Sequence, residues 1–262
     1  MVIGQPYSMQ LSNKKRSINE LSILIHKDGF SFCTNEQHLL FALEHNPPSE
    51  ESLKSWLAYH QLTQPIQKII FLDHPALTVP LALFDETLAH DYLKSAVTES
   101  KDLTPANNRL NAQEQAVVYG MNTLWDKLFQ KVFPAAQRSH LVSELLPALS
   151  QYSSGKAKRN LFVHLRKDAF DLFLYQGGQL LLQNSFPQST ADDFLYYLFY
   201  VTEQFYLKPE QFNLFFLGKY TQYNAYYEGV KEFHEAISFF EPQYSFIDHQ
   251  HPVPFFQTFS AE

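Results

Sequence analysis

Two ten-residue stretches decide the fold prediction: LSILIHKDGF at residues 21–30 and LFVHLRKDAF at residues 161–170. Each contains an apolar run, a short polar turn that includes Lys-Asp, and a phenylalanine that opens the next run. At the constant offset of 140 residues the similarity extends over residues 21–49 and 161–189. The identical pairs are Leu21 and Leu161, Lys27 and Lys167, Asp28 and Asp168, Phe30 and Phe170, Leu40 and Leu180, Pro47 and Pro187, and Ser49 and Ser189. Self-similarity at a fixed offset predicts one supersecondary unit that is used twice.

The pattern around these stretches predicts the same order of elements in each half: a hairpin, a third strand, a helix, a strand and a helix. Asp28-Gly29 between apolar runs favours a hairpin turn, and Gly177-Gly178 is predicted to be a turn in the second half. Ser49 in the first half, and Ser189 or Thr190 in the second, are predicted to cap the following helices. The alternation of strands and helices predicts mixed α/β layers.

The offset also gives the domain organisation. We expect a flexible polar lead-in at residues 1–17, a first unit at residues 18–158 and a second unit at residues 159–262. The first unit is expected to carry an additional strand and helices at about 86–158. Within that insertion, residues 98–113 are polar and contain proline, so they are predicted to form a loop.

The composition excludes several classes of protein. The net charge is −7 and the pI is near 5.9, which disfavours nucleic acid because its phosphates bind basic faces. Cys33 is the single cysteine, so an internal disulfide or a cysteine-based metal site is excluded, and we interpret Cys33 as a core thiol. No run approaches the roughly 20 apolar residues of a spanning helix, and residues 1–20 contain no apolar signal-peptide core. We therefore expect a cytoplasmic protein.

A family resemblance rests on three segments: the Leu161–Tyr175 hairpin, the Phe212–Gly218 strand and turn, and Val79–Asp85. With these segments the chain resembles the actin/heat-shock-70/hexokinase superfamily of actin-like ATPases, especially its pilus-assembly and cell-division branches. It is also similar to a Bacteroidetes family of domains of unknown function. The resemblance covers most of residues 18–247. It implies a tandem duplication of ribonuclease-H-like units, each a mixed sheet with flanking helices, around a cleft.

The nucleotide motifs of that superfamily are degenerate here. Its second phosphate loop resembles Asp-x-Gly-Gly-Gly-Thr-x-Asp, and on this chain the first acid is replaced by His164 while the last is retained as Asp171. The positions of the three glycines hold Arg166, Lys167 and Asp168, whose side chains would crowd the backbone approach to phosphate. The first strand of the chain contains no aspartate. Of the paired glycines typical of the adenosine motif, one remains, Gly218.

The residues most exposed to a ligand in such a cleft would be those of the two hairpin tips and the degenerate motifs. The alternative is that an aspartate at a hairpin tip simply satisfies its turn. No catalytic residue and no metal ligand is predicted. The candidate cleft residues are Lys27, Asp28, His164, Arg166, Lys167, Asp168, Asp171 and Gly218.

The doubled topology with degenerate motifs predicts a pseudoenzyme: a non-catalytic, cytoplasmic relative of actin-like ATPases that acts as a protein-interaction or scaffold module without ATP or Mg²⁺. The sequence leaves the identity of the partner protein and the oligomeric state open. Two alternatives stay open: a nucleotide-dependent phosphotransferase or ATPase with non-standard loops, and a small-molecule sensor that uses the inter-lobe cleft. The aromatic-rich segment Phe194–Tyr206 is predicted to be a helix that packs in the core or meets a partner.

Overall fold

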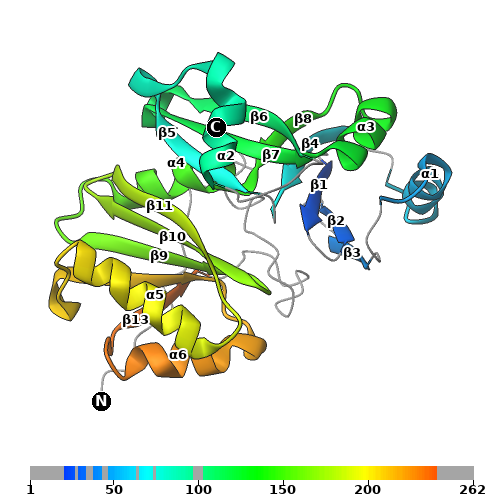
Figure 1. Cartoon of the computed structure of the whole chain (residues 1–262). Coiled ribbons are helices and arrows are strands. Elements are labelled where there is room, and N and C mark those ends of the chain that lie inside the picture. Colours follow the sequence, from blue (N-terminus) through cyan, green and yellow to red (C-terminus); the bar gives the residue numbers. More distant parts are fainter. Residues whose placement is uncertain are drawn as a thin grey trace. The chain divides into compact units, whose positions relative to one another are not determined.

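The computed structural model describes residues 21–26, 29–33, 38–42, 47–62, 65–72, 75–96 and 103–240 (Figure 1). It is an α/β protein with three sheets and six α-helices over these residues. The chain divides into two compact units, called here the N-terminal unit, which ends at Pro147, and the C-terminal unit, which begins at Ala148. This division falls inside α4 (Leu141–Ser153). The unit boundary expected from the sequence offset, at residues 158–159, stays a prediction.

The main sheet of the N-terminal unit has the strand order β3-β2-β1-β4-β8. Strands β3, β2 and β1 pair with one another antiparallel, and β4 and β8 continue the sheet in parallel with β1. The strands are β1 (Leu21–His26), β2 (Gly29–Cys33), β3 (His38–Ala42), β4 (Ile66–Phe71) and β8 (Gln137–His140). Helix α1 (Glu50–Tyr59) follows β3, and the hydroxyl of its N-cap Ser49 accepts the Ser52 N–H as predicted.

A second, three-stranded sheet completes the N-terminal unit, in the order β5-β7-β6. Its strands are β5 (Ala76–Pro80), β6 (Leu103–Leu110) and β7 (Gln115–Asn122), and its helices are α2 (Ala89–Ala96) and α3 (Thr123–Val132). The prediction of a loop at residues 98–113 is therefore wrong for the stretch that forms β6. Pro105 fits this strand because β6 lies at the edge of its sheet, where a missing N–H breaks no ladder.

The C-terminal unit has one sheet, in the order β11-β10-β9-β12-β13. Its strands are β9 (Arg159–Leu165), β10 (Ala169–Gln176), β11 (Gln179–Pro187), β12 (Phe212–Leu217) and β13 (Ile237–Phe240). The helices are α5 (Ala191–Gln204) and α6 (Asn224–Lys231). Strand order and direction repeat those of the five-stranded sheet in the N-terminal unit. Short 3₁₀ turns occur at Leu81–Leu83, Glu86–Leu88, Asn111–Gln113, Pro209–Gln211 and Thr221–Tyr223.

The two hairpins also share their register at the predicted offset. Ile25 pairs with Phe30 in the first, and Leu165 pairs with Phe170 in the second. The agreement ends at the third strand: Ser31 pairs with Leu40, but Asp171 pairs with Ser185 rather than with Leu180. The two sheets thus have the same topology, while descent from a duplicated sequence stays a prediction.

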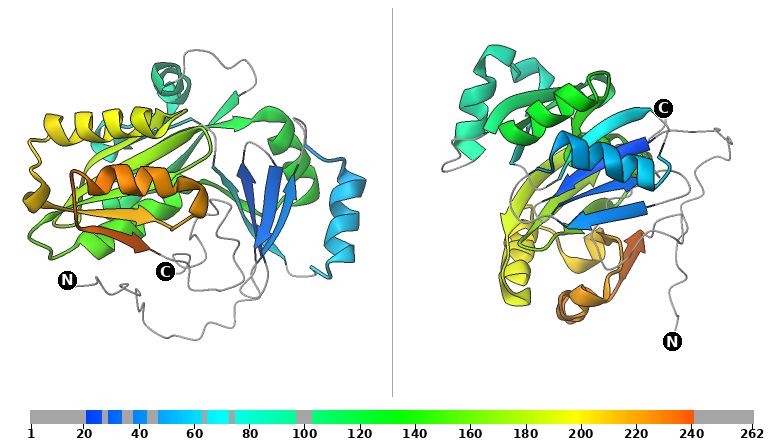
Figure 2. Two further views of the ribbon diagram at one scale, coloured as in Figure 1. Left: turned by 90° about the horizontal axis from the view of Figure 1, so that it is seen from below. Right: turned by 90° about the vertical axis from the view of Figure 1, so that its right-hand side faces the viewer.

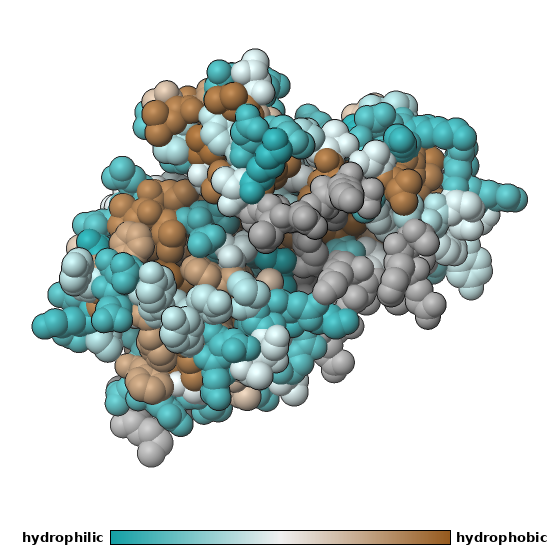
Figure 3. Space-filling model, in the orientation of Figure 1, coloured by the Kyte–Doolittle hydropathy of each residue, from teal (hydrophilic) through white to brown (hydrophobic). Residues whose placement is uncertain are grey.

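The sheet of the C-terminal unit is covered on both faces. Helices α5 and α6 lie side by side on one face, where Leu161, Val163, Phe194 and Leu198 belong to one buried cluster (Figure 2). The other face carries aromatic rings, which the end of α4 covers with Tyr152. The α5 side that points away from the sheet mixes residues of intermediate hydropathy with hydrophilic ones (Figure 3).

Candidate functional site

The candidate site lies at the turn between β9 and β10. The turn consists of Arg166, Lys167 and Asp168, at the positions where the superfamily motif has glycines. Strand β12 runs parallel to β9, with Phe216 paired to Val163, so Gly218 lies at the same edge of the sheet as this turn. In open α/β sheets, ligands bind outside the carboxyl ends of parallel strands. The fold therefore brings the degenerate motifs of the C-terminal unit to one edge.

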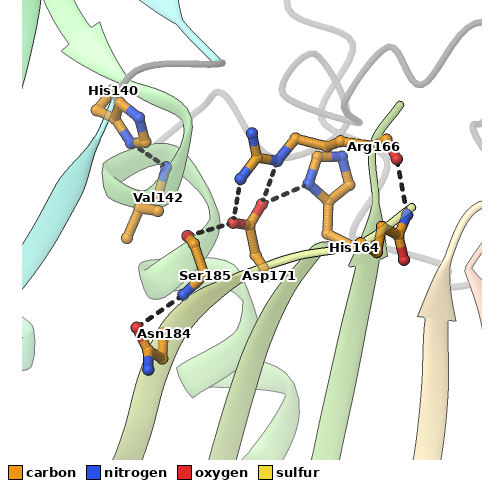
Figure 4. Close-up of polar contacts among 8 residues, drawn as sticks. His140, Val142, His164, Arg166, Asp171, Asn184 and Ser185 are labelled. Carbon is orange, nitrogen blue, oxygen red and sulfur yellow. Dashed lines mark hydrogen bonds and ion pairs between the residues drawn. The ribbon is translucent and has the colours of Figure 1, made fainter. Parts of the chain in front are cut away.

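At the base of the turn, Asp171 accepts hydrogen bonds on both carboxylate oxygens (Figure 4). Its Oδ2 is 2.9 Å from His164 Nδ1 and 3.0 Å from Arg166 Nε. Its Oδ1 is 2.8 Å from Arg166 Nη2 and 2.5 Å from the Ser185 hydroxyl. The antiparallel register produces this arrangement, because His164 and Asp171 are direct partners across β9 and β10.

This cluster is buried and electrostatically paired. His164, Arg166 and Asp171 are all more than nine-tenths buried. Burial alone would raise the pKa of the Asp171 carboxyl, but the Arg166 guanidinium and the His164 ring lower it far below its usual range. A carboxylate offers about four lone-pair sites, and the four contacts occupy them. Arg166 is in turn neutralised by the bidentate pair with Asp171.

The backbone of the turn is also engaged. The Arg166 N–H donates to the Ala169 carbonyl at 2.8 Å. Gln188, which follows β11, donates two hydrogen bonds to the turn. Its backbone N–H donates to the Asp168 carbonyl at 3.0 Å, and its side-chain Nε2 donates to the Arg166 carbonyl at 2.9 Å. None of the three turn residues has a positive φ, so the turn does not use the conformation that glycine would permit. The side chains of Lys167 and Asp168 are exposed.

Gly218, after β12, has a separate structural role. Its φ is +99°, and a Cβ added there would lie 2.5 Å from the ring of Tyr220. The Tyr220 ring is buried, and its backbone N–H donates to the Tyr227 hydroxyl at 3.1 Å. Burial raises the pKa of Tyr227 to about 12. The glycine is therefore required both by the backbone conformation and by the tyrosine that covers it.

The structure brings some of the eight candidate cleft residues into contact with one another. His164, Arg166 and Asp171 form one cluster, Lys167 and Asp168 form the tip of the turn, and Gly218 packs against Tyr220. Lys27 and Asp28, the tip of the first hairpin, lie outside the described residues. In that hairpin the positions matching His164 and Asp171 are Leu24 and Ser31, so the register carries no charged pair there.

Sequence reasoning missed Ser185 and Gln188. The Gly177-Gly178 turn gives only an approximate signal, because a two-residue turn that pairs Gln176 with Gln179 places Asn184, the neighbour of Ser185, opposite Asp171. An irregularity in the pairing after Leu174 moves the register by one residue to Ser185. For Gln188, which contacts the turn from beyond the end of β11, the sequence contains no comparable signal.

Among the described residues, no group of three or more His, Cys, Asp or Glu side chains could hold a metal ion. No helix in the described part of the chain is long and apolar enough to cross a membrane.

A family described as proteins of unknown function, DUF3822, matches residues 8–237. The chain belongs to the DUF3822 family. No curated protein matches this DUF3822 chain significantly.

Among solved structures, the DUF3822 chain is similar to a protein from Bacteroides thetaiotaomicron described as having an actin-like ATPase fold and unknown function. The TM-score is 0.73 at 22% sequence identity, and the match covers 84% of this chain and 90% of that one. This confirms the predicted actin-like ATPase fold. The PilM–PilN type IV pilus biogenesis complex has a TM-score of 0.47 at 10% identity, with 86% and 88% of the two chains covered. At that level it carries no argument about function.

Proposed function

We propose that this DUF3822 protein is a non-catalytic member of the actin-like ATPase fold that acts in the cytoplasm as a protein-interaction or scaffold module. The observation that carries the proposal is the saturated Asp171 carboxylate, which accepts four hydrogen bonds from three side chains of the same unit. An acid that positions Mg²⁺ or water for phosphoryl transfer needs an oxygen lone pair that is open to that ligand.

The residues at the turn do not fit a Mg²⁺-nucleotide. A phosphate cradle presents backbone N–H groups from residues that lack side chains. Here the Arg166 N–H is bonded to the Ala169 carbonyl, and all three residues of the turn carry side chains. The positive charge of Arg166 is compensated by Asp171 at a distance of 2.8 Å, so it contributes little net attraction for phosphate.

The position of the adenosine motif supports the same proposal. A glycine beside a nucleotide allows the ligand to approach the backbone closely. In this protein the Tyr220 ring takes that place against Gly218 and is itself buried. The space next to the glycine is thus filled by the chain's own side chain.

Calorimetric titration of the full chain with Mg·ATP tests the proposal. We expect no heat of binding and no thermal stabilisation at millimolar ATP. Lys167→Ala is the matched variant, because Lys167 is exposed at the turn and its removal leaves the Asp171 cluster intact. Micromolar binding that Lys167→Ala weakens, or ATP turnover above background, would overturn the proposal.

That same result would favour a second candidate function, a nucleotide-dependent phosphotransferase with a non-standard loop. The observation in its favour is the exposed Lys167 ammonium beside Arg166 at the carboxyl end of β9. Lysine binds phosphate as a point charge without a glycine-rich cradle. The Mg·ATP titration therefore distinguishes the two candidate functions: the first predicts no binding and the second predicts binding.

A further inference from the structure

The outward side of α5 carries a row of aromatic rings, called here the aromatic stripe: Tyr196, Phe199 and Tyr200 of α5 together with Phe233, which follows α6. The three α5 residues are spaced at i, i+3 and i+4, so they share one helical face. Tyr196 and Tyr200 stack at 6.4 Å between ring centroids, and Phe199 contacts Phe233 at 4.7 Å. The stripe therefore consists of two ring pairs, one within α5 and one that joins α5 to the residue after α6.

Three of the four rings of the stripe are exposed and Phe199 is half-buried, although α5 has a complete core-facing side. Tyr196 is 65% exposed, Tyr200 48% and Phe233 57%. The opposite side of α5, with Phe194, Leu198 and Val201, is buried in the core. Because that side already fixes the helix to the sheet, the fold does not require aromatic residues on the outside. Clustered exposed aromatic rings are typical of protein–protein contact surfaces.

Acidic side chains surround the stripe. Asp192 and Glu203 lie at its two ends on α5, and Glu232 and Glu235 flank Phe233; all four are exposed. The nearest lysine of α6, Lys231, is paired with Glu228 at 2.7 Å. Over residues 191–236 the chain has seven acidic residues and three lysines. Within this segment acidic side chains thus outnumber basic ones, and Arg159, which lies outside it, donates to the Phe205 carbonyl just after α5.

We propose that the aromatic stripe binds a basic amphipathic segment of another protein, with lysine or arginine side chains over the tyrosine rings and against the acidic rim. This deepens the proposed function, on which it rests, by naming the surface and the charge of the partner. Cations are attracted to the faces of tyrosine rings, and the aliphatic stems of lysine and arginine cover apolar surface. Opposite charges at the rim favour such a partner.

The same charges argue against two other occupants. A second copy that paired α5 with α5 in antiparallel orientation would place Asp192 of one chain beside Glu203 of the other, and like charges oppose that contact. Residues 241–262 of this chain contain no lysine or arginine, so they lack the charge that the rim selects.

Fluorescence anisotropy with the full chain tests the proposal. The probe is a labelled amphipathic helical peptide of lysine, leucine and alanine, and its control is the same peptide with glutamate in place of lysine. We expect the lysine peptide to bind and the glutamate peptide not to bind. The double substitution Tyr196→Ala with Tyr200→Ala should weaken binding about tenfold, since two ring contacts are lost. Glu232→Gln with Glu235→Gln should weaken binding and reduce its dependence on salt.

Tyr59→Ala is the matched control, because Tyr59 is an exposed tyrosine of α1 in the N-terminal unit, 81% accessible. It should leave peptide affinity unchanged, and circular dichroism should show that all variants are folded. Equal loss with Tyr59→Ala, no loss with the double tyrosine variant, or no binding at all would each overturn the proposal. So would a dimer in sedimentation that the double variant dissociates, because it would assign the stripe to a second copy. If the lysine peptide does not bind and Mg·ATP also gives no heat, the aromatic stripe is not the binding surface, but the proposal of a non-catalytic protein still holds.

Discussion

Arg166 folds back onto Asp171 in a bidentate ion pair, with Nε 3.0 Å from Oδ2 and Nη2 2.8 Å from Oδ1. The pair occupies the place where the actin-like superfamily motif has a glycine and an acid. Arginine and carboxylate match each other's planar geometry, so the pair fixes the turn as well as neutralising it. The Arg166 guanidinium and the Asp171 carboxylate are therefore both used in an internal contact of the hairpin.

Replacing Asp171 with asparagine should destabilise the protein by about 3–5 kcal/mol, because the Arg166 charge would stay buried without its partner. The measurement is urea unfolding followed by circular dichroism. Asp168→Asn is the matched control: it removes an exposed carboxylate from the same turn, where any contact is screened by water, and should change the free energy of unfolding by at most about 1 kcal/mol. Equal effects of the two substitutions would contradict the structural role given to Asp171.

The stability of the protein should also fall as the pH drops from 7 to 5, through His234. This side chain is buried and stacks on Phe212 at 4.5 Å. Burial lowers the pKa of His234 below its ordinary value of about 6.5, so the unfolded chain binds the proton more readily than the folded one. The stabilising contribution is complete above pH 6.5 and is lost as the pH falls through the lowered folded pKa. In thermal unfolding at pH 7 and pH 5, His234→Phe should lose less stability than the wild type, and parallel curves would contradict this assignment.

Substitutions of Gly218, after β12, and of Gly177, in the turn between β10 and β11, distinguish backbone strain from steric overlap. Gly218→Ala combines an unfavourable φ of +99° with a Cβ at 2.5 Å from the Tyr220 ring, and should destabilise by about 3 kcal/mol. Gly177→Ala has φ +59° and nothing within 4 Å, so strain alone should make it lose about 1 kcal/mol. Chemical denaturation of both variants gives the difference. Equal losses would show that Tyr220 does not restrict residue 218.

The sequence predicted the parts of this fold that depend on local pattern. The two hairpins follow from a repeat and from a short turn, which are local signals, whereas the pairing of His164 with Asp171 was not predicted and comes from the register of β9 and β10. Ser185 was missed because it is paired with Asp171 through an irregularity in the register of β10 and β11, and no residue type in these strands predicts that irregularity. Strand β6 was missed because its polar residues satisfy tertiary contacts instead of following an alternating apolar pattern. The exposure of Tyr196 depends on the neighbours of α5, which composition does not reveal.

Asn108 of β6 shows what such a polar residue does and provides a final prediction. Its Oδ1 accepts hydrogen bonds from the Ser143 hydroxyl at 2.8 Å and the His140 N–H at 3.1 Å, and its Nδ2 donates to the Arg138 carbonyl at 3.1 Å. These bonds tie the edge of the three-stranded sheet to β8 and the start of α4. Asn108→Ala would leave several buried groups without partners, and should destabilise by about 2–3 kcal/mol.

The neighbouring Asn107 is the matched control for that substitution. Its Nδ2 contacts Glu86 at 3.4 Å on the exposed side, so Asn107→Ala should change the free energy of unfolding by less than about 0.5 kcal/mol. Hydrogen exchange adds a local readout: in Asn108→Ala the amide of His140 should exchange faster, because it loses its acceptor. If Asn108→Ala and Asn107→Ala unfold at the same denaturant concentration, the hydrogen bonds of Asn108 do not hold β6 to β8, and the apolar contacts of the unit must do so instead.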